Sequence, residues 1–198
     1  MKNLPSLILT ALVIFVLPIA GYSQPDTAKI TSKALDIADS LIKADKYENW
    51  KNYADLAPDG VIKYYGGKDG YIEHIRVGRM RTLSMIEEDA PVLKPLQFLS
   101  RNEEWQGVIR ASRYIHKDDN TKLHVVTYFI CQSKDDGETW RIFDVSYNSV
   151  ANIIYLMPDI NDELAIKEPT VMTPEEELAK EQQAKAAAAG QKTTAKKK

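Results

Sequence analysis

The sequence predicts an α+β domain in which helices precede an antiparallel sheet. Apolar residues follow a helical period through the first part of the domain. After Pro91 and Pro95 the pattern changes to runs rich in β-branched and aromatic residues, separated by short turns. One of these turns contains Asp136-Gly137, a dipeptide typical of β-hairpins. Helices followed by a run of strands favour the α+β class over an alternating α/β arrangement.

The first 23 residues have the three parts of a secretory signal peptide. Lys2 makes the start positively charged, and residues 7–20 form an apolar run in which only Thr10 is polar. Gly21-Tyr22-Ser23 then places small residues at the −3 and −1 positions of a cleavage site before Gln24. The run is shorter than the roughly 20 residues of a bilayer-spanning helix. We therefore expect cleavage after Ser23 and export to the periplasm or the exterior of a bacterial cell.

Three helices and one short strand are expected next. The first helix has one apolar face, made of Ile30, Ala34, Ile37, Ala38, Leu41 and Ile42. Asp45 with Glu48 resembles a capping box that begins a second helix, which ends at Pro58-Asp59-Gly60. Residues 61–65, which include Tyr64, are predicted to form a strand. Asp69 can cap a third helix, on which Ile72, Ile75, Arg79 and Leu83 share a face.

Four strands are expected after the helices, at residues 96–105, 108–116, 123–133 and 139–148. An apolar stretch at 153–157 is expected to pack against the edge of the domain. From residue 168 to 198 the composition becomes rich in Ala, Gln, Glu and Lys with almost no apolar face. The expected organisation is a signal peptide at 1–23, one domain at 24–167, and a disordered or transiently helical tail at 168–198.

The segment from Ser133 to Trp140 matches the pattern S-x-D-x-G-x-T-W and resembles the Asp-box of sialidases and other β-propellers. It occurs once, in a chain too short for a propeller, so it indicates a structural hairpin turn. If Asp136-Gly137 is a two-residue loop, paired positions sum to 273, which places Ile130 opposite Phe143 and Phe129 opposite Asp144. A three-residue loop would shift this register by one residue and exchange the faces.

The order of these elements resembles the nuclear-transport-factor-2-like (cystatin-like) superfamily over about residues 26–157. Trp50, the Pro58-Asp59-Gly60-Val61 step and the segment from Gly137 to Val145 (Gly-x-x-Trp-Arg-Ile-x-Asp-Val) carry the resemblance. It implies a curved sheet that wraps around the helices as a cone-shaped barrel, with an apolar pocket, and dimerisation through the sheet. The superfamily includes ketosteroid isomerase, scytalone dehydratase, polyketide cyclases of the SnoaL type and non-catalytic domains. The catalytic residues of the first two have no counterparts here.

Composition excludes several classes of site. The formal net charge is −2, and basic residues do not interleave with aromatic ones, so we expect no nucleic-acid partner. Cys131 is the only cysteine and lies in an apolar run, which predicts a buried, inert thiol. His74, His116 and His124 lack the spacing of a metal site. We therefore expect no metal, no other cofactor and no transmembrane segment in the mature chain.

Asp144 and Arg79 are the strongest candidates for a functional site. In the fold that the resemblance implies, the third helix and the last strand both border the pocket, so the two charges could pair there. Asp144 is the candidate general base, and Arg79, Tyr64, His124 and Phe129 are the candidate pocket residues. The alternative, which we favour, is that the two charges are structural: an ion pair, or an arginine whose head group extends to solvent.

Two classes of function follow. The first is a non-catalytic module of the cell envelope that binds a small apolar ligand or an envelope protein and dimerises through its sheet. The alternative is a cofactor-free lyase or isomerase in which Asp144 is the base. The sequence leaves open whether the protein is an enzyme.

Overall fold

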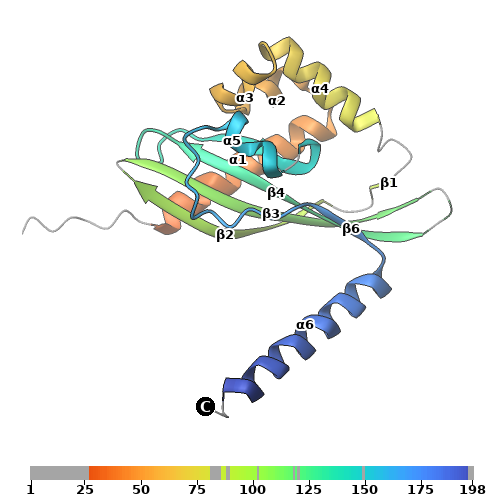
Figure 1. The fold of residues 1–198 in the computed structure, drawn as a ribbon. Helices are drawn as coiled ribbons and strands as arrows, with labels where there is room; N and C mark the ends of the chain where they lie inside the picture. Colours follow the sequence, from red (N-terminus) through yellow and green to blue (C-terminus); the bar gives the residue numbers. More distant parts are fainter. Residues whose placement is uncertain are drawn as a thin grey trace, which may run out of the picture.

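The computed structural model of the chain describes residues 27–80, 86–87, 90–101, 103–117, 119, 121–148 and 150–195. The predicted signal peptide and Leu83 lie outside the described residues. Within them, helices come first and an antiparallel sheet follows, so the predicted α+β class is confirmed (Figure 1). No helix in these ranges is both long and apolar enough to cross a bilayer.

Four helices precede the sheet, not three: α1 (Thr27–Lys46), α2 (Trp50–Leu56), α3 (Asp59–Tyr64) and α4 (Lys68–Met80). The apolar stripe of α1 is buried as predicted, with Ala34 and Ala38 fully inaccessible. The extra helix is α3, which occupies the segment predicted as a strand. Hydrogen bonds run from Ile62 N to Pro58 O and from Tyr65 N to Val61 O, as in a helix. A four- or five-residue apolar run does not distinguish a strand from a short helix by periodicity.

The predicted capping box at the start of the second helix is wrong. α1 continues through Asp45 to Lys46, and Glu48 has a positive φ of 54° in the turn that follows. Asn49 is the N-cap of α2, and its side chain accepts a hydrogen bond from Asn52 N at 3.2 Å. Asp45 is therefore available for a tertiary contact, described below.

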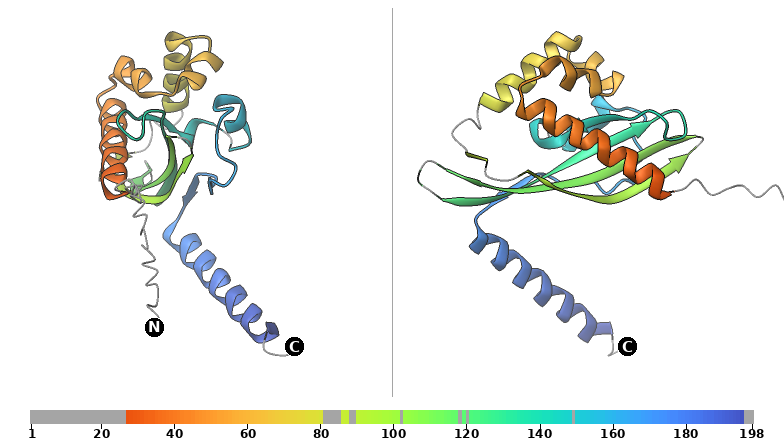
Figure 2. Two further views of the ribbon diagram at one scale, coloured as in Figure 1. Left: turned by 90° about the vertical axis from the view of Figure 1, so that its left-hand side faces the viewer. Right: turned by 180° about the vertical axis from the view of Figure 1, so that it is seen from behind.

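Among the described residues, six antiparallel strands form one sheet: β1 (Ile86–Glu87), β2 (Val92–Arg101), β3 (Glu104–His116), β4 (Lys122–Ser133), β5 (Arg141–Asp144) and β6 (Thr170–Met172). β1 and β2 both pair with one edge of β3, while β5 and β6 both pair with the opposite edge of β4. These outer strands do not pair with one another, so the sheet is curved but open (Figure 2). The prediction of a cone-shaped barrel is therefore wrong. β5 ends at Asp144, so it does not continue along the edge of β4.

Both faces of the sheet are covered. α1 packs against one face, and the chain after α5 (Ile153–Leu156) crosses the other (Figure 2). Gln106 holds this crossing segment, donating to Asp159 O at 2.9 Å and accepting from Asn161 N at 2.7 Å. Ile153 and Leu156 are buried, so the apolar stretch at 153–157 packs against the domain as predicted.

The β4–β5 hairpin has the predicted register. Ile130 lies opposite Phe143, and Phe129 lies opposite Asp144. Asp136 and Gly137 both have positive φ, at 52° and 81°. The connection is longer than a two-residue loop, however, because β4 ends at Ser133 and β5 begins at Arg141.

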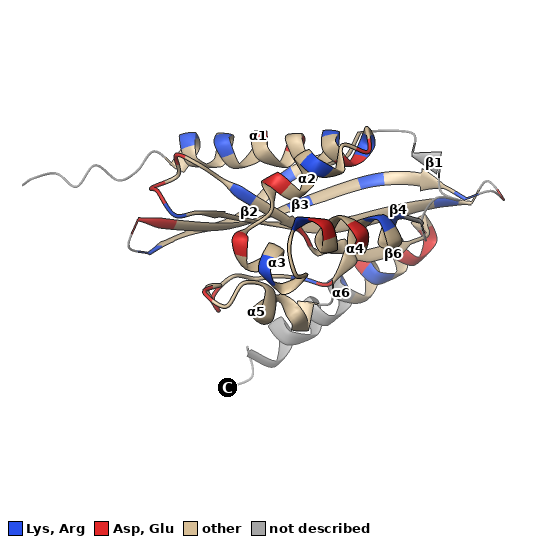
Figure 3. Ribbon diagram, turned by 90° about the horizontal axis from the view of Figure 1, so that it is seen from above, with Lys and Arg blue, Asp and Glu red and all other residues tan. Residues whose placement is uncertain are grey.

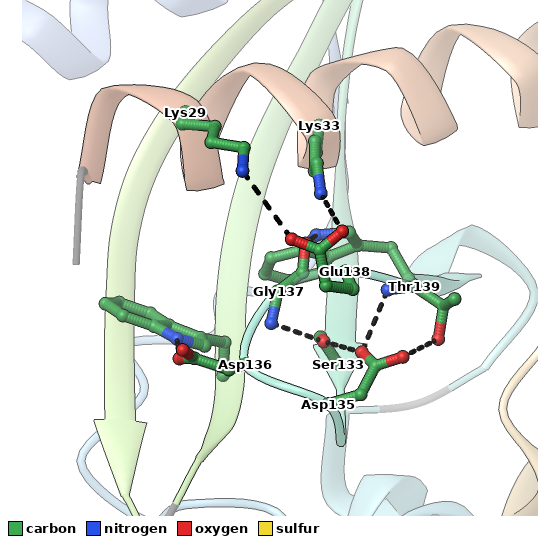
Figure 4. Close-up of polar contacts among 10 residues, drawn as sticks. Lys29, Lys33, Ser133, Asp135, Asp136, Gly137, Glu138 and Thr139 are labelled. Carbon is green, nitrogen blue, oxygen red and sulfur yellow. Dashed lines mark hydrogen bonds and ion pairs between the residues drawn. The ribbon is translucent and has the colours of Figure 1, made fainter.

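Side-chain hydrogen bonds explain how this longer loop keeps the register (Figure 4). Asp135 accepts from Ser133 Oγ, Thr139 N and Thr139 Oγ1 at 2.6–2.8 Å, and these bonds lower its pKa to about 2. Gly137 N donates to Ser133 Oγ, and the Trp140 indole donates to Gly137 O. The Asp-box residues thus form a structural turn, as predicted.

The same loop docks the first helix against the sheet. Lys33 Nζ lies 2.8 Å from Glu138 Oε2, and Lys29 Nζ lies 3.6 Å from Glu138 Oε1 (Figure 4). Gly137 packs against Ile30, so closely that a Cβ on Gly137 would lie 2.1 Å from Ile30 Cδ1. The Asp-box turn therefore connects the sheet to α1.

The C-terminal segment adds a strand and a helix where the sequence predicts a tail. β6 pairs with β4, with Val171 opposite Val125. α6 (Pro174–Ala195) then projects away from the domain (Figure 1). Thr173 and Glu176 form a reciprocal capping box at its start, with N···O distances of 3.2 and 2.8 Å.

Candidate functional site

A cavity of about 590 Å³ lies between the helices and the sheet. Its lining comes from α1, α2, α4, the sheet, the 3₁₀ helix η1 (Val145–Tyr147) and the segment around β6: Leu41, Ile42, Asp45, Tyr53, His74, Val77, Gly78, Arg79, Pro91, Ala111, Arg113, Ile115, Val125, Thr127, Phe129, Asp144, Ser146, Tyr147, Asn148, Pro169 and Val171. This volume is in the range of small-molecule sites.

The apolar wall of the cavity follows from strand alternation. Ala111 and Ile115 on β3, with Val125 and Phe129 on β4, all occupy odd-numbered positions, which point to one face of the sheet. Even-numbered neighbours such as Ile130 point to the other face. The predicted pocket residue Phe129 is therefore part of the cavity, because the confirmed hairpin register places it there.

Asp144 lines the cavity at the point where the chain leaves the sheet. It is the last residue of β5, and its Oδ1 accepts hydrogen bonds from Thr127 Oγ1 at 2.9 Å and Ser146 N at 2.7 Å. The second bond makes Asp144 the N-cap of η1. Burial raises the pKa of the Asp144 carboxyl, and the hydrogen bonds from Ser146 and Thr127 and the charge of Arg113 oppose that rise.

Arg79 also lines the cavity, but its partner is Asp45. Arg79 Nη1 lies 2.5 Å from Asp45 Oδ2, and the two side chains are only 19% and 17% exposed. The expected pair between Arg79 and Asp144 is therefore wrong. Asp45 reaches Arg79 because α1 continues through Asp45 to Lys46, where the second helix was predicted to begin.

A second polar cluster joins α3, α4 and the end of η1. The Tyr65 hydroxyl donates to Asn148 Oδ1 and lies 3.1 Å from His74 Nε2. His74 Nε2 also lies 3.2 Å from Tyr147 O, and the His74 ring stacks on Tyr65 with centroids 4.3 Å apart. His74 and Asn148 line the cavity. No local sequence pattern predicts this cluster, because its members are separated by up to 83 positions.

Two buried tyrosines complete the helical side of the site. Burial raises the pKa of the hydroxyls of Tyr53 and Tyr71, and their rings lie 6.1 Å apart. Apart from a contact with each other, these hydroxyls have no hydrogen-bond partner among the described residues. Tyr53 also lines the cavity, and the raised pKa of its hydroxyl keeps that group neutral.

Two predicted pocket residues lie elsewhere. Tyr64 is 52% exposed at the end of α3 and is not part of the cavity lining, since its segment is a helix and not a strand. His124 is buried near the start of β4, on the opposite face from Val125. Its Nδ1 lies 2.7 Å from Glu177 Oε1 of α6, and its ring stacks on Tyr114. His124 thus contacts the C-terminal helix.

The charges on the described surface are mixed in sign. Viewed from above, basic and acidic residues both occur over the helices (Figure 3). Within the described ranges there is no group of three or more His, Cys, Asp or Glu side chains placed to hold a metal. Cys131 is buried, which raises the pKa of its thiol.

Comparisons with known proteins give no relative: no protein-family model, no curated protein and no solved structure matches the chain.

Proposed function

We propose that this chain is an exported module that binds a small, largely apolar molecule in the cavity between its helices and its sheet. The observation that carries the proposal is the cavity itself: about 590 Å³, lined by apolar side chains from both the sheet and the helices with a few polar groups among them. Sites for small molecules combine these two features, since apolar contact supplies affinity and a few polar groups fix orientation.

The rim of the cavity supports an apolar ligand. Val77 on α4 and Val171 on β6 line the cavity and are also 37% and 54% exposed. Pro91 and Pro169 lie in the lining as well. An apolar molecule would bury these exposed carbons, at about 25 cal/mol for each Å² removed from water.

A matched pair of tryptophan variants on β4 tests this proposal. Val125→Trp places an indole in the cavity, whereas Lys122→Trp places it on an exposed position three residues earlier. With N-phenyl-1-naphthylamine as a fluorescent apolar probe, we expect saturable binding to the wild type and to Lys122→Trp. Val125→Trp should lose binding while still unfolding cooperatively. Equal binding by all three proteins, or none by the wild type, would contradict the proposal.

A second candidate function is acid–base catalysis by Asp144 without a cofactor, as a lyase or isomerase. The specific observation is that this carboxyl lines the cavity while burial raises its pKa, as in many catalytic bases. Asp144→Asn preserves the acceptor for Thr127 and Ser146. If Asp144 is a base, this variant should bind ligand as the wild type does but abolish turnover. If the protein only binds, ligand isolated with it should be recovered unchanged by mass spectrometry.

A further inference from the structure

The Asn148 amide is fixed in one orientation by its neighbours. Tyr147 O can only accept a hydrogen bond, so His74 Nε2, 3.2 Å away, carries a proton. That proton also faces the Tyr65 hydroxyl, 3.1 Å away, which leaves the hydroxyl proton of Tyr65 directed at Asn148. Asn148 must therefore present Oδ1 to Tyr65. Its Nδ2 group points the other way.

This orientation leaves an unsatisfied hydrogen-bond donor on a residue that lines the cavity. Asn148 Nδ2 is buried and has no hydrogen-bond partner among the described residues. A buried donor without a partner destabilises the fold, so such a group calls for a ligand or another specific explanation. The Tyr53 hydroxyl, also in the lining, is a second neutral donor with no partner except Tyr71.

The charges around these donors are already matched. Arg79 pairs with Asp45, and the charge of Arg113 acts on Asp144 from the neighbouring part of the sheet. A charged group on the ligand would compete with one of these partners and lose its own hydration. A neutral oxygen acceptor would satisfy Asn148 without disturbing either pair.

We infer that the ligand presents a neutral oxygen acceptor, such as a carbonyl, to Asn148 Nδ2, and that Tyr65 and His74 position this amide. The inference rests on the proposed binding function and names the class of ligand: an uncharged apolar molecule with an acceptor oxygen. Asn148 is the contact residue, whereas Tyr65 acts through Asn148 and is a positioning residue.

Two probes of similar shape test the acceptor. 2-Acetylnaphthalene carries a carbonyl oxygen that 2-ethylnaphthalene lacks, and 2-naphthoate carries a negative charge. Each is measured by displacement of N-phenyl-1-naphthylamine. Asn148→Leu keeps the approximate size of the side chain without the donor. We expect the affinity ratio of ketone to hydrocarbon to fall about tenfold in Asn148→Leu, the effect of one hydrogen bond.

Tyr65→Phe tests the positioning role, with Tyr64→Phe as the control because Tyr64 is an exposed tyrosine on the same helix turn. The infrared stretch of the bound ketone reports a hydrogen bond to its carbonyl directly. It should lie at lower frequency in the wild type and in Tyr64→Phe, and it should shift upward in Tyr65→Phe and Asn148→Leu. A purely structural role for Tyr65 would change stability but not this frequency.

The outcomes separate this inference from the proposed function. If both naphthalene probes bind but neither the affinity ratio nor the carbonyl frequency changes in Asn148→Leu and Tyr65→Phe, the inference is wrong and the binding function stands. Tightest binding by 2-naphthoate would also overturn it, because the ligand class would then be anionic. If no probe binds the wild type, the proposed function itself fails.

Discussion

Arg79 on α4 donates a short hydrogen bond to Asp45 at the end of α1, with 2.5 Å between Nη1 and Oδ2. The pair joins two helices across one side of the cavity, and both side chains are mostly buried. Asp144 also lies in the cavity wall, on the sheet, but Arg79 binds Asp45 and not Asp144. This arrangement changes the effects expected for mutations at the two carboxylates.

Asp45→Asn should destabilise the domain by about 2 kcal/mol, since it leaves Arg79 partly buried without its carboxylate. The value is lower than for a fully buried pair because some water reaches both groups. Urea unfolding of the variant measures the loss. Adding Arg79→Met removes the positive charge that Asp45 neutralises and should recover part of the stability; a double variant less stable than Asp45→Asn would contradict this account.

The stability of the Asp144→Asn variant relative to the wild type should increase as pH rises. Because burial raises the pKa of Asp144 in the folded state, the folded protein holds this proton more tightly than the unfolded chain. That contribution to stability is complete below the usual pKa near 3.8 and is lost as pH rises through the folded pKa. The difference in free energy of unfolding, variant minus wild type, should therefore increase between about pH 4 and pH 7. A difference that stays constant over this range would argue against a raised pKa.

Asp135 should have the opposite dependence on pH. Its hydrogen bonds with Thr139 and Ser133 lower its pKa from 3.8 to about 2, so its contribution is present above about pH 4 and is lost as pH falls towards 2. The gap in melting temperature between the wild type and Asp135→Asn should narrow over this acid range. Asp36→Asn, which removes an exposed carboxylate from α1, is the control.

Gly137→Ala should cost more stability than Gly66→Ala. The two glycines have similar positive φ values, 81° and 75°, so both substitutions carry comparable backbone strain of about 1 kcal/mol. Only at Gly137 would the new Cβ also meet a neighbour, Ile30 Cδ1 at 2.1 Å, whereas nothing lies within 4 Å at Gly66. Thermal unfolding of both variants measures the difference.

The contact with Ile30 can be tested separately. Ile30→Val removes the Cδ1 atom that a Cβ on Gly137 would meet. Ile30→Val should therefore lower the free energy of unfolding less in the Gly137→Ala variant than in the wild type. Equal costs in the two backgrounds would mean that Ile30 does not limit residue 137.

The N-terminal pattern predicts cleavage between Ser23 and Gln24 when the protein is exported. Small residues at positions −3 and −1 are what signal peptidases accept, so Ser23→Leu should block processing. Sequencing the N-terminus of protein from the periplasm or the medium decides the matter. A mature chain that still begins at Met1 would refute export by this route, and Tyr22→Leu, which leaves both small residues in place, serves as the control.

The sequence alone was sufficient for features set by near neighbours. The apolar spacing of Ile30, Ala34 and Ala38 produced the buried face of α1, because helical period depends on residues three and four apart. The Asp136-Gly137 turn predicted the register that places Phe129 opposite Asp144, because the turn conformation fixes where two strands meet. Both predictions rest on interactions within about a dozen residues.

Tertiary structure decided which distant groups meet. Residues 61–64 belong to helix α3, which packs against α5 where Gly60 fits closely against Leu156 O, and strand propensity takes no account of that contact. Asp45 rather than Asp144 binds Arg79 because α1 continues through Asp45 to Lys46, where the second helix was predicted to begin. The Tyr65–Asn148 contact spans 83 positions, and such contacts depend on how the whole chain closes around its core. Local sequence sets the conformation of each element, but the partners of the polar groups in this cavity are set by the packing of helices on an open sheet.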